Sequence, residues 1–408
     1  MNPEASTAGI PPVTPDLLRP PPPPETNAPA ATPPKVQSRS PLRVAIIGTM
    51  GLPARYGGFE TLARYLVEYL GDEFEFTVYC SGPDYAEKPK TYLNARLVYI
   101  PFKANGAQSI CFDFLNFAHA WRHSDLLLVL GVSGGLAMPF CRFFKKASIL
   151  NIGGLDWQRS KWGPFAKRLL RLFESAAVRT ARLNVTDNQG IADYMRTAYG
   201  RESVLIEYGG DQTTKPGISG ELSGKYPFLD RPYAFAVARI QMDNNPELLL
   251  YAFNQVPEAE FVFVGNWKGS EYGRELKKRY ELYPNLHLLE AIYDPVELNV
   301  IRAHCSYYVH GHSAGGTNPS LVEAMNLSLP IAAFDVVYNR ATTENRVRYF
   351  HNVASLVELI LKVPQSEWDG QRSIVKDIAH RRYRWEGIAQ KYAELFRRLD
   401  PRRSPAAG

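Results

Sequence analysis

The sequence predicts an α/β protein built from two doubly wound parallel sheets, and three observations favour this fold class. Short aliphatic runs alternate with helical patterns along most of the chain. This alternation pauses once, near Asp211, before a second series begins. At 408 residues the chain can hold two domains of ordinary size, each with its own core. Ligands bind such sheets outside the carboxyl ends of the strands, so we expect the function there.

The first series predicts seven strands, at 43–48, 75–80, 96–101, 125–131, 147–153, 182–187 and 203–209. The second predicts five, at 233–239, 260–265, 286–291, 307–311 and 330–335, with helices between them such as 246–256 and 318–326. Together they predict a first domain over 42–211, a polar linker over 212–231, a second domain over 232–380 and a C-terminal helix over 381–400.

The N-terminal segment 1–41 stands apart by composition. It contains 13 prolines and almost no aromatic or branched apolar residues. Such a segment cannot bury a core, so we expect a disordered or polyproline-like tail. No basic and apolar leader follows Met1, so export is not expected. The four cysteines lie far apart, which favours neither a zinc site nor disulfides and suits a reducing cytoplasm.

A glycine-rich stretch, IIGTMGLPARYGGFE at 46–60, joins the first strand to the next helix. Its spacing fits neither the dinucleotide fingerprint nor the P-loop, so a nicotinamide enzyme or an NTPase is not supported. Gly57 and Gly58 nevertheless open a helix directly, where backbone N–H groups can cradle phosphate. A plain tight turn remains the alternative, above all for Gly48 and Gly51.

Positive charge is concentrated between residues 140 and 182. Ten Lys or Arg stand there against Asp156 and Glu174. The predicted helix 164–182 places apolar residues on one face, namely Phe165, Leu169, Leu172, Phe173 and Ala176. Its other face is basic and carries Lys167, Arg168, Arg171 and Arg182. This face is either the solvated side of a packed helix or an attachment to anionic lipid headgroups. Nucleic acid is not an expected partner, because no reader motif accompanies the charge.

The order of the motifs PARYGGFE, YGGD, ARIQMDNNPELLLYAF, VGN, HGHSAGGTNPSLVEAM and LPIAAFD resembles glycosyltransferase family four. Two stretches, GTMGLPARYGGFET and GLDWQRSKW, look like the branch that includes rhamnosyltransferases of polysaccharide assembly. The resemblance runs from about Arg43 to about Phe396. It implies a GT-B fold, in which two Rossmann-like domains face a central cleft and the last helix crosses back to the first domain.

The resemblance implies a retaining hexosyltransferase, similar to rhamnosyltransferases. Such an enzyme moves a sugar, with L-rhamnose as one candidate, from a nucleotide diphosphate donor to a lipid-linked oligosaccharide. The setting would be cell-surface polysaccharide synthesis, with the protein in the cytoplasm and peripheral on the inner face of the membrane. No D-x-D pair occurs in the sequence, so we expect no metal, and no cofactor beyond the donor substrate.

The residues that match the family's motifs fall into three groups. Those implied to bind the donor are Gly57, Gly58, Arg239, Gly315, Gly316, Thr317, Asn318 and Glu323. The implied catalytic residues are Arg239, Glu323 and His312. Those expected to meet the acceptor are Glu60, Asp156, Trp157, Arg159 and Lys161, although Glu60 could instead fix the glycine loop. Those expected to meet the anionic membrane are Lys167, Arg168 and Arg171.

Three positions depart from the family's pattern. Gly315 stands where many relatives have a glutamate, Asn244 where they commonly have a lysine, and Gly153 where an acidic residue is expected. These departures leave an alternative open: a catalytically inactive GT-B protein that binds at the membrane surface.

Overall fold

The computed structural model of the chain describes residues 40–54, 57–104, 108–132, 135–158 and 163–402. The prediction of a disordered Pro-rich tail falls outside these residues, apart from its last two positions.

The first sheet has eight strands in the order β3-β4-β2-β1-β5-β6-β7-β8, and all neighbours are parallel except β3 and β4. Its strands are β1 Leu42–Ile47, β2 Phe74–Ser81, β3 Thr91–Tyr92, β4 Ala95–Ile100, β5 Leu126–Leu130, β6 Ala147–Ile152, β7 Leu183–Thr186 and β8 Val204–Leu205. The sequence predicted all but β3, whose two residues are too few to form a pattern.

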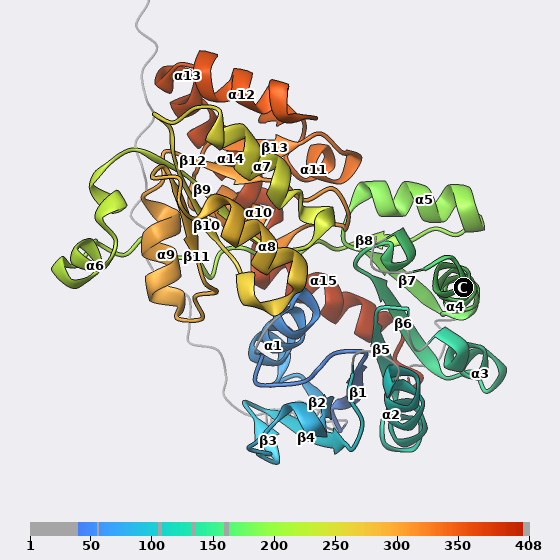
Figure 1. The fold of residues 1–408 in the computed structure, drawn as a ribbon. Coiled ribbons are helices and arrows are strands. Elements are labelled where there is room, and N and C mark those ends of the chain that lie inside the picture. Colours follow the sequence, from blue (N-terminus) through green and yellow to red (C-terminus); the bar gives the residue numbers. More distant parts are fainter. Residues whose placement is uncertain (1–39, 55–56, 105–107, 133–134, 159–162, 403–408) are drawn as a thin grey trace, which may run out of the picture. The chain divides into compact units, whose positions relative to one another are not determined.

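Helices connect these strands (Figure 1): α1 Gly58–Leu70, α2 Ser109–His123, α3 Met138–Phe143, α4 Pro164–Thr180 and α5 Gln189–Tyr199. Strand β5 is buried along its whole length, because the sheet has an apolar core on each face. Leu128 lies in one core and Leu127 in the other, as the alternation of side chains along a strand requires.

The second sheet has six parallel strands in the order β11-β10-β9-β12-β13-β14. They are β9 Tyr233–Val237, β10 Glu260–Val264, β11 Leu286–Leu289, β12 Tyr307–His310, β13 Ile331–Phe334 and β14 Arg348–Phe350, the last of which was not predicted. The accompanying helices are α7 Pro246–Asn254, α8 Glu271–Tyr280, α9 Pro295–Ala303, α10 Pro319–Asn326, α11 Val337–Thr342, α12 Val353–Lys362, α13 Gln365–Asp369 and α14 Gln371–Arg382. The predicted α/β class with parallel sheets is confirmed.

The segment between the two series is not wholly irregular. It contains the short helix α6 Gly220–Lys225 and a 3₁₀ helix at Pro227–Asp230. Phe228 and Leu229 are buried in a core of the second sheet, where the ring of Phe228 meets Tyr233 edge-on at 5.3 Å. The end of the segment is therefore anchored by apolar packing.

The last helix, α15 Trp385–Arg398, follows the second sheet in sequence but packs against α1. Figure 1 shows the red α15 beside the blue α1. Its inward residues, among them Trp385, Tyr392 and Phe396, complete a core of the first sheet. The ring of Phe396 meets Phe74 edge-on at 5.3 Å. The stability of the first sheet therefore depends on the chain's C-terminal helix.

Phe396→Ala should test this dependence. Phe396 is fully buried, so its truncation leaves a cavity and should lower the free energy of unfolding by about 3–5 kcal/mol. Urea unfolding followed by circular dichroism measures the change. Leu282→Ala, at a side chain that is 88% exposed, is the control and should cost less than about 0.5 kcal/mol. Equal effects of the two substitutions would contradict the packing role of α15.

Candidate functional site

The glycine loop that follows β1 is held by a buried carboxylate. Glu60 accepts hydrogen bonds from the Met50 backbone N–H at 2.7 Å and the Thr49 hydroxyl at 2.9 Å. Gly57 has φ of 126°, and a Cβ added there would lie 2.1 Å from Oε2 of Glu60. The loop therefore needs a glycine at this position. Glu60 is only 7% exposed and turns towards the loop, which fits the fixing role more closely than contact with an acceptor.

The N-termini of two helices from the two sheets meet beside this loop. Helix α1 begins at Gly58 and α10 begins at Pro319, and a Cβ on Gly58 would lie 3.6 Å from Cγ of Pro319. Asn318 caps α10, since its side chain accepts from the Ser320 backbone N–H. Helix N-termini carry unpaired N–H groups and partial positive charge. The structure thus brings together the two segments expected to contact the donor's phosphates.

The second glycine loop approaches the first sheet closely. A Cβ on Gly316 would lie 1.9 Å from Oδ1 of Asp187, and one on Gly154 would lie 3.4 Å from Cα of Gly315. Gly315 has φ of 125°, a conformation that other residues adopt only with strain. A glutamate cannot replace Gly315 on this backbone without strain. The glycine that departs from the family's pattern at this position thus suits the conformation of this loop.

Asp187, at the end of β7, was not singled out from the sequence. It is 1% exposed, and neither carboxylate oxygen has a hydrogen-bond partner among the described residues. Burial raises the pKa of Asp187 well above its usual range, so the carboxyl is neutral over a wider range of pH. Its backbone carbonyl accepts a hydrogen bond from the Thr317 hydroxyl, which fastens the second glycine loop to β7.

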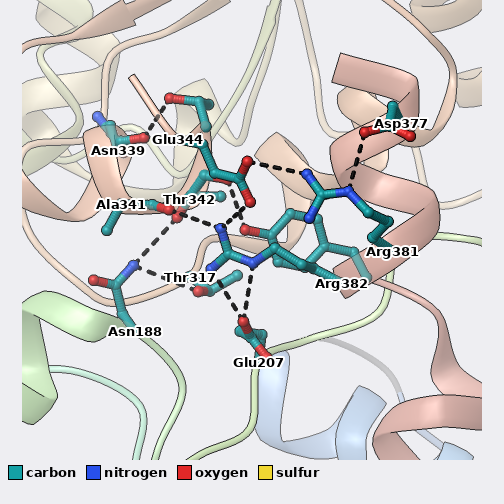
Figure 2. Close-up of polar contacts among 12 residues, drawn as sticks. Asn188, Glu207, Thr317, Asn339, Ala341, Thr342, Glu344, Asp377, Arg381 and Arg382 are labelled. Carbon is teal, nitrogen blue, oxygen red and sulfur yellow. Dashed lines mark hydrogen bonds and ion pairs between the residues drawn. The ribbon is translucent and has the colours of Figure 1, made fainter. Parts of the chain in front are cut away.

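Figure 2 shows the polar contacts that surround this attachment. The side-chain amide of Asn188 donates to the Tyr338 carbonyl at 3.1 Å and to the Thr342 hydroxyl at 3.2 Å. Nearby, Arg382 donates twice to the buried Glu207, at 3.0 and 3.2 Å, and once to Glu344. The contacts of Asn188 and the Arg382–Glu207 pair join the first series to the second, whereas Glu344 steadies Arg382 from within the second series. These contacts fix the separation of the two glycine loops.

Glu323, the expected ribose ligand, lies on α10 with both oxygens engaged. Arg302 donates to Oε2 at 2.6 Å, and the Gln212 amide donates to Oε1 at 2.7 Å. The Arg302 side chain is 5% exposed and that of Glu323 is 19% exposed. Each carboxylate oxygen can accept more than one hydrogen bond, so Glu323 can still accept from a ligand hydroxyl.

Arg239 lies just past the end of β9 and is exposed. No hydrogen bond or ion pair of its guanidinium is present among the described residues. Asn244 is 3% exposed, and its side-chain amide donates to the Arg239 carbonyl at 2.7 Å. The residue that replaces the expected lysine therefore supports the backbone of Arg239 and does not point into solvent.

Two histidines stack ahead of the second glycine loop. The rings of His310 and His312 lie 4.3 Å apart at an angle of 11°. His310 is fully buried, and this burial lowers its pKa well below the usual value. His310 is therefore neutral at physiological pH and serves as packing and as a neutral hydrogen-bonding group. His312 is partly exposed, so it is the histidine that can reach a ligand.

The loop expected to meet the acceptor is described only in part. Asp156 and Trp157 begin a 3₁₀ helix after β6, whereas Arg159 and Lys161 lie outside the described residues. The guanidinium of Arg171 lies over the Trp157 ring, 4.7 Å from its centroid. Trp157 is partly buried against the core of the first sheet. The indole thus connects this loop to helix α4.

The predicted packing face of α4 is wrong in two places. Phe165 is 80% exposed and Leu172 58% exposed, although both were expected on the packed face. The inward face instead contains Phe173, Ala177, Val178 and Glu174, whose carboxylate accepts from two tyrosine hydroxyls. An apolar pattern cannot reveal a face that buries a glutamate. The exposed apolar residues therefore lie on the helix that carries Arg168 and Arg171.

The neighbouring helix α3 extends this exposed surface. Helices α3 and α4 are in contact, and Phe140, Phe143 and Phe144 on and after α3 are all exposed. Within the described residues, no helix combines the length and the apolar character needed to cross a bilayer.

Comparison with solved structures identifies the fold. Sucrose-phosphate synthase from Thermosynechococcus elongatus superimposes with a TM-score of 0.74 at 17% identity, over 88% of this chain and 99% of that one. The Anabaena protein HepE in complex with UDP and glucose superimposes with a TM-score of 0.69 at 17% identity, over 88% and 100%. These likenesses define the fold as GT-B, as predicted.

The second series matches a known family in sequence. Residues 221–376 match the family model described as glycosyl transferases group 1. Residues 42–211 match a model described as a domain of unknown function, DUF1972. No curated protein matches the chain significantly in sequence. The predicted resemblance to GT-B glycosyltransferases is confirmed, whereas the rhamnosyltransferase branch and the site residues stay predictions.

Asp187→Asn should reveal the cost of the buried carboxyl. Folding raises the pKa of Asp187. The contribution of this carboxyl to the free energy of unfolding is therefore fully present below the unfolded pKa of about 3.9, and it is lost as pH rises towards the folded pKa. The melting temperature of the variant minus that of the wild type should therefore become more positive between pH 5 and pH 8.

The matched control is Asp125→Asn. Burial pushes the pKa of Asp125 up, but hydrogen bonds from Arg43 outweigh it and lower the pKa overall. Asp125 is therefore ionised throughout this range. The difference in melting temperature between Asp125→Asn and the wild type should stay constant. A constant difference for Asp187→Asn as well would contradict the raised pKa.

Proposed function

We propose that this protein is a retaining glycosyltransferase that moves a sugar from a nucleotide diphosphate donor to a lipid-linked oligosaccharide. L-rhamnose is our candidate sugar, and the inner face of the cell membrane is the proposed location. The observation that carries the proposal is the meeting of the N-termini of α1 and α10 at Gly58 and Pro319. Two helix N-termini at one place favour a ligand with two adjacent negative groups, such as a diphosphate.

Two similar structures support a nucleotide-sugar donor. HepE is described in complex with UDP-glucose and with UDP and glucose. A trehalose-6-phosphate protein from E. coli, described as bound with UDP-2-fluoro glucose, superimposes with a TM-score of 0.63 at 11% identity over 87% of this chain and 98% of that one. Each is similar to this chain in fold, so we infer the same class of donor.

In the proposed reaction, the bond between the sugar's anomeric carbon and the diphosphate breaks, and the acceptor oxygen forms a bond to that carbon from the same face. The proton of the acceptor hydroxyl then passes to the oxygen of the leaving diphosphate. Negative charge grows on the leaving diphosphate. Arg239, with no side-chain partner in the described part of the chain, has the planar guanidinium suited to this group. Backbone N–H groups at the start of α1 add preorganised donors that need not reorient during the reaction, and the dipole of α10, whose first N–H groups are bonded to Asn318, adds positive potential. Glu323 would hold the ribose.

The surface of α3 and α4 supports a membrane-bound acceptor. It combines exposed aromatic side chains, Phe143 and Phe165, with Arg168 and Arg171. An open hollow of about 380 Å³ lies beside α4, lined by Arg168, Arg171, Leu172, Ser175 and Tyr199. Aromatic rings enter the interfacial region of a bilayer while basic groups contact lipid phosphates. We propose that this surface lies on the membrane and brings the acceptor lipid to the site.

Arg239→Ala should weaken donor binding. The loss of a bidentate, charge-assisted contact corresponds to an increase of about tenfold to a hundredfold in the dissociation constant. The measurement is calorimetry with the best ligand from a thermal-shift panel of UDP, GDP and dTDP sugars and their bare diphosphates. The dissociation constant of Arg239→Lys, which keeps the charge, should lie between those of the wild type and Arg239→Ala. Arg231→Ala, at the opposite end of β9, is the matched control.

An unchanged titration for Arg239→Ala would remove this residue from the site. Hydrolysis of the donor in the absence of acceptor, followed by product analysis, separates an enzyme from the alternative, an inactive GT-B binding protein. Binding of a nucleotide sugar without hydrolysis or transfer would favour that alternative.

Charge reversal on α4 should release the protein from anionic membranes. Each basic residue near such a surface contributes about 1 kcal/mol, so Arg168→Glu with Arg171→Glu should weaken binding to phosphatidylglycerol vesicles by on the order of a hundredfold. Co-sedimentation measures the partition. The matched control, Arg274→Glu with Lys278→Glu, makes the same change on α8 of the second sheet. If both pairs weaken binding equally, α4 has no special role.

A further inference from the structure

The segment from Tyr208 to Gln212 passes through a slot that excludes side chains at two positions. A Cβ on Gly209 would lie 2.5 Å from the Trp385 indole, and one on Gly210 would lie 2.6 Å from the Val322 carbonyl oxygen. The segment is therefore confined between the start of α15 and helix α10. Its first four residues, YGGD, are part of the resemblance described above, but no role has yet been given to the segment.

Confinement places two polar side chains of this segment against Trp385. Asp211 accepts a hydrogen bond from the Trp385 backbone N–H at 2.9 Å. The side-chain oxygen of Gln212 accepts from the indole N–H at 2.8 Å. An indole nitrogen can only donate, so it fixes which end of the Gln212 amide faces it. The amide nitrogen is then directed away from Trp385, towards Glu323, to which it donates at 2.7 Å.

The second oxygen of Glu323 is held from the other side. Arg302 donates to it at 2.6 Å from a guanidinium that is almost fully buried. The carboxylate is thus gripped at both oxygens, one by a charged donor and one by a neutral donor. Its plane cannot rotate without breaking one of these two hydrogen bonds. A carboxylate held in this way keeps its remaining lone pairs in fixed directions.

Trp385 in turn is attached to the helix that carries the first glycine loop. Its ring stacks on Tyr65 of α1 at a centroid distance of 4.4 Å and an angle of 18°. The ring of Tyr208 meets Trp385 edge-on at 6.4 Å, and a Cβ on Gly58 would lie 3.5 Å from Tyr208. One indole therefore contacts α1 by its face and the partner of Glu323 by its edge.

We propose that Gln212, Trp385 and Arg302 are positioning residues for Glu323. They hold its carboxylate in the orientation that accepts hydrogen bonds from the ribose hydroxyls of the donor. Trp385 also stacks on Tyr65, so the position of Gln212, and through it that of Glu323, depends on the position of α1. The inference rests on the proposed function, since it assumes a nucleotide donor. None of the three residues needs to contact the nucleotide itself.

The test compares two ligands in each variant. The first is the nucleoside diphosphate that most stabilises the wild type in the panel, and the second is its 3′-deoxy analogue. In the wild type we expect the deoxy analogue to bind more weakly by about tenfold, the effect of one hydrogen bond to a charged group. Trp385→Phe keeps the stacking but removes the indole N–H, and Gln212→Leu removes the bridging amide. Both substitutions should reduce the ratio of the two dissociation constants, that of the deoxy analogue over that of the parent ligand, to about threefold or less.

Trp368→Phe is the matched control. Trp368 is a buried indole that stacks on Tyr307 at 4.5 Å in a different core, so its substitution should leave the ratio unchanged. Thermal unfolding checks the fold of each variant. Gln212 is only partly buried, so Gln212→Leu remains informative if Trp385→Phe is unstable.

The outcomes separate the two proposals. If the wild type discriminates between the ligands and both variants discriminate equally well, the positioning role is overturned while nucleotide binding stands. If the variants lose affinity for both ligands by the same factor, Gln212 and Trp385 are structural and the role is again overturned. If the wild type binds no nucleoside diphosphate, the proposed function fails and this inference fails with it.

Discussion

The structure depends on a close approach between two parts of the backbone. One is the second glycine loop, which follows β12, and the other consists of the residues that follow β6 and β7. The second glycine loop lies against Gly154 and Asp187 at distances that leave no room for a Cβ at Gly316. This approach brings the N-terminus of α10 next to that of α1. A side chain at Gly316 would collide with the Asp187 carboxyl and push the second glycine loop away from the first sheet. The glycines are thus needed for the contact itself, and the surrounding polar contacts hold it in place.

The same approach explains the buried polar groups around it. Asp187 has no hydrogen-bond partner for its carboxylate within the described residues, which is costly in free energy. Protonation reduces that cost, in agreement with the raised pKa. By contrast, Glu207 is equally buried but is paired with Arg382. Burial therefore favours the protonated form of Asp187, whereas the charge of Glu207 is compensated by a guanidinium.

The sequence predicted most of the fold and only part of the site. Strand patterns are local, so twelve strands could be read from aliphatic runs, and only the short β3 and β14 were missed. The glycine loops, Arg239 and Glu323 were assigned to the candidate site through motif order, and their roles stay predictions. The contacts that hold Glu323 were not found, because Gln212 lies 111 residues from Glu323 and 173 residues from Trp385 along the chain. Packing brings such pairs together, and no local pattern marks them. The exposed face of α4 was missed for a related reason, since its inward side buries the polar Glu174.

The charge available in the proposed donor site can be compared with what a nucleotide sugar requires. Its diphosphate carries two negative charges before the reaction. Asn244 contributes no charge, and its amide is committed to the Arg239 carbonyl. Arg239 supplies one positive charge, and two helix N-termini supply roughly half a charge each, about two in total. That balance matches the bound donor without a second cation. The third negative charge, which develops as the sugar leaves, must then be met by backbone N–H groups. The position of the glycine loops, more than the number of basic residues, therefore determines how well this site could stabilise the transition state.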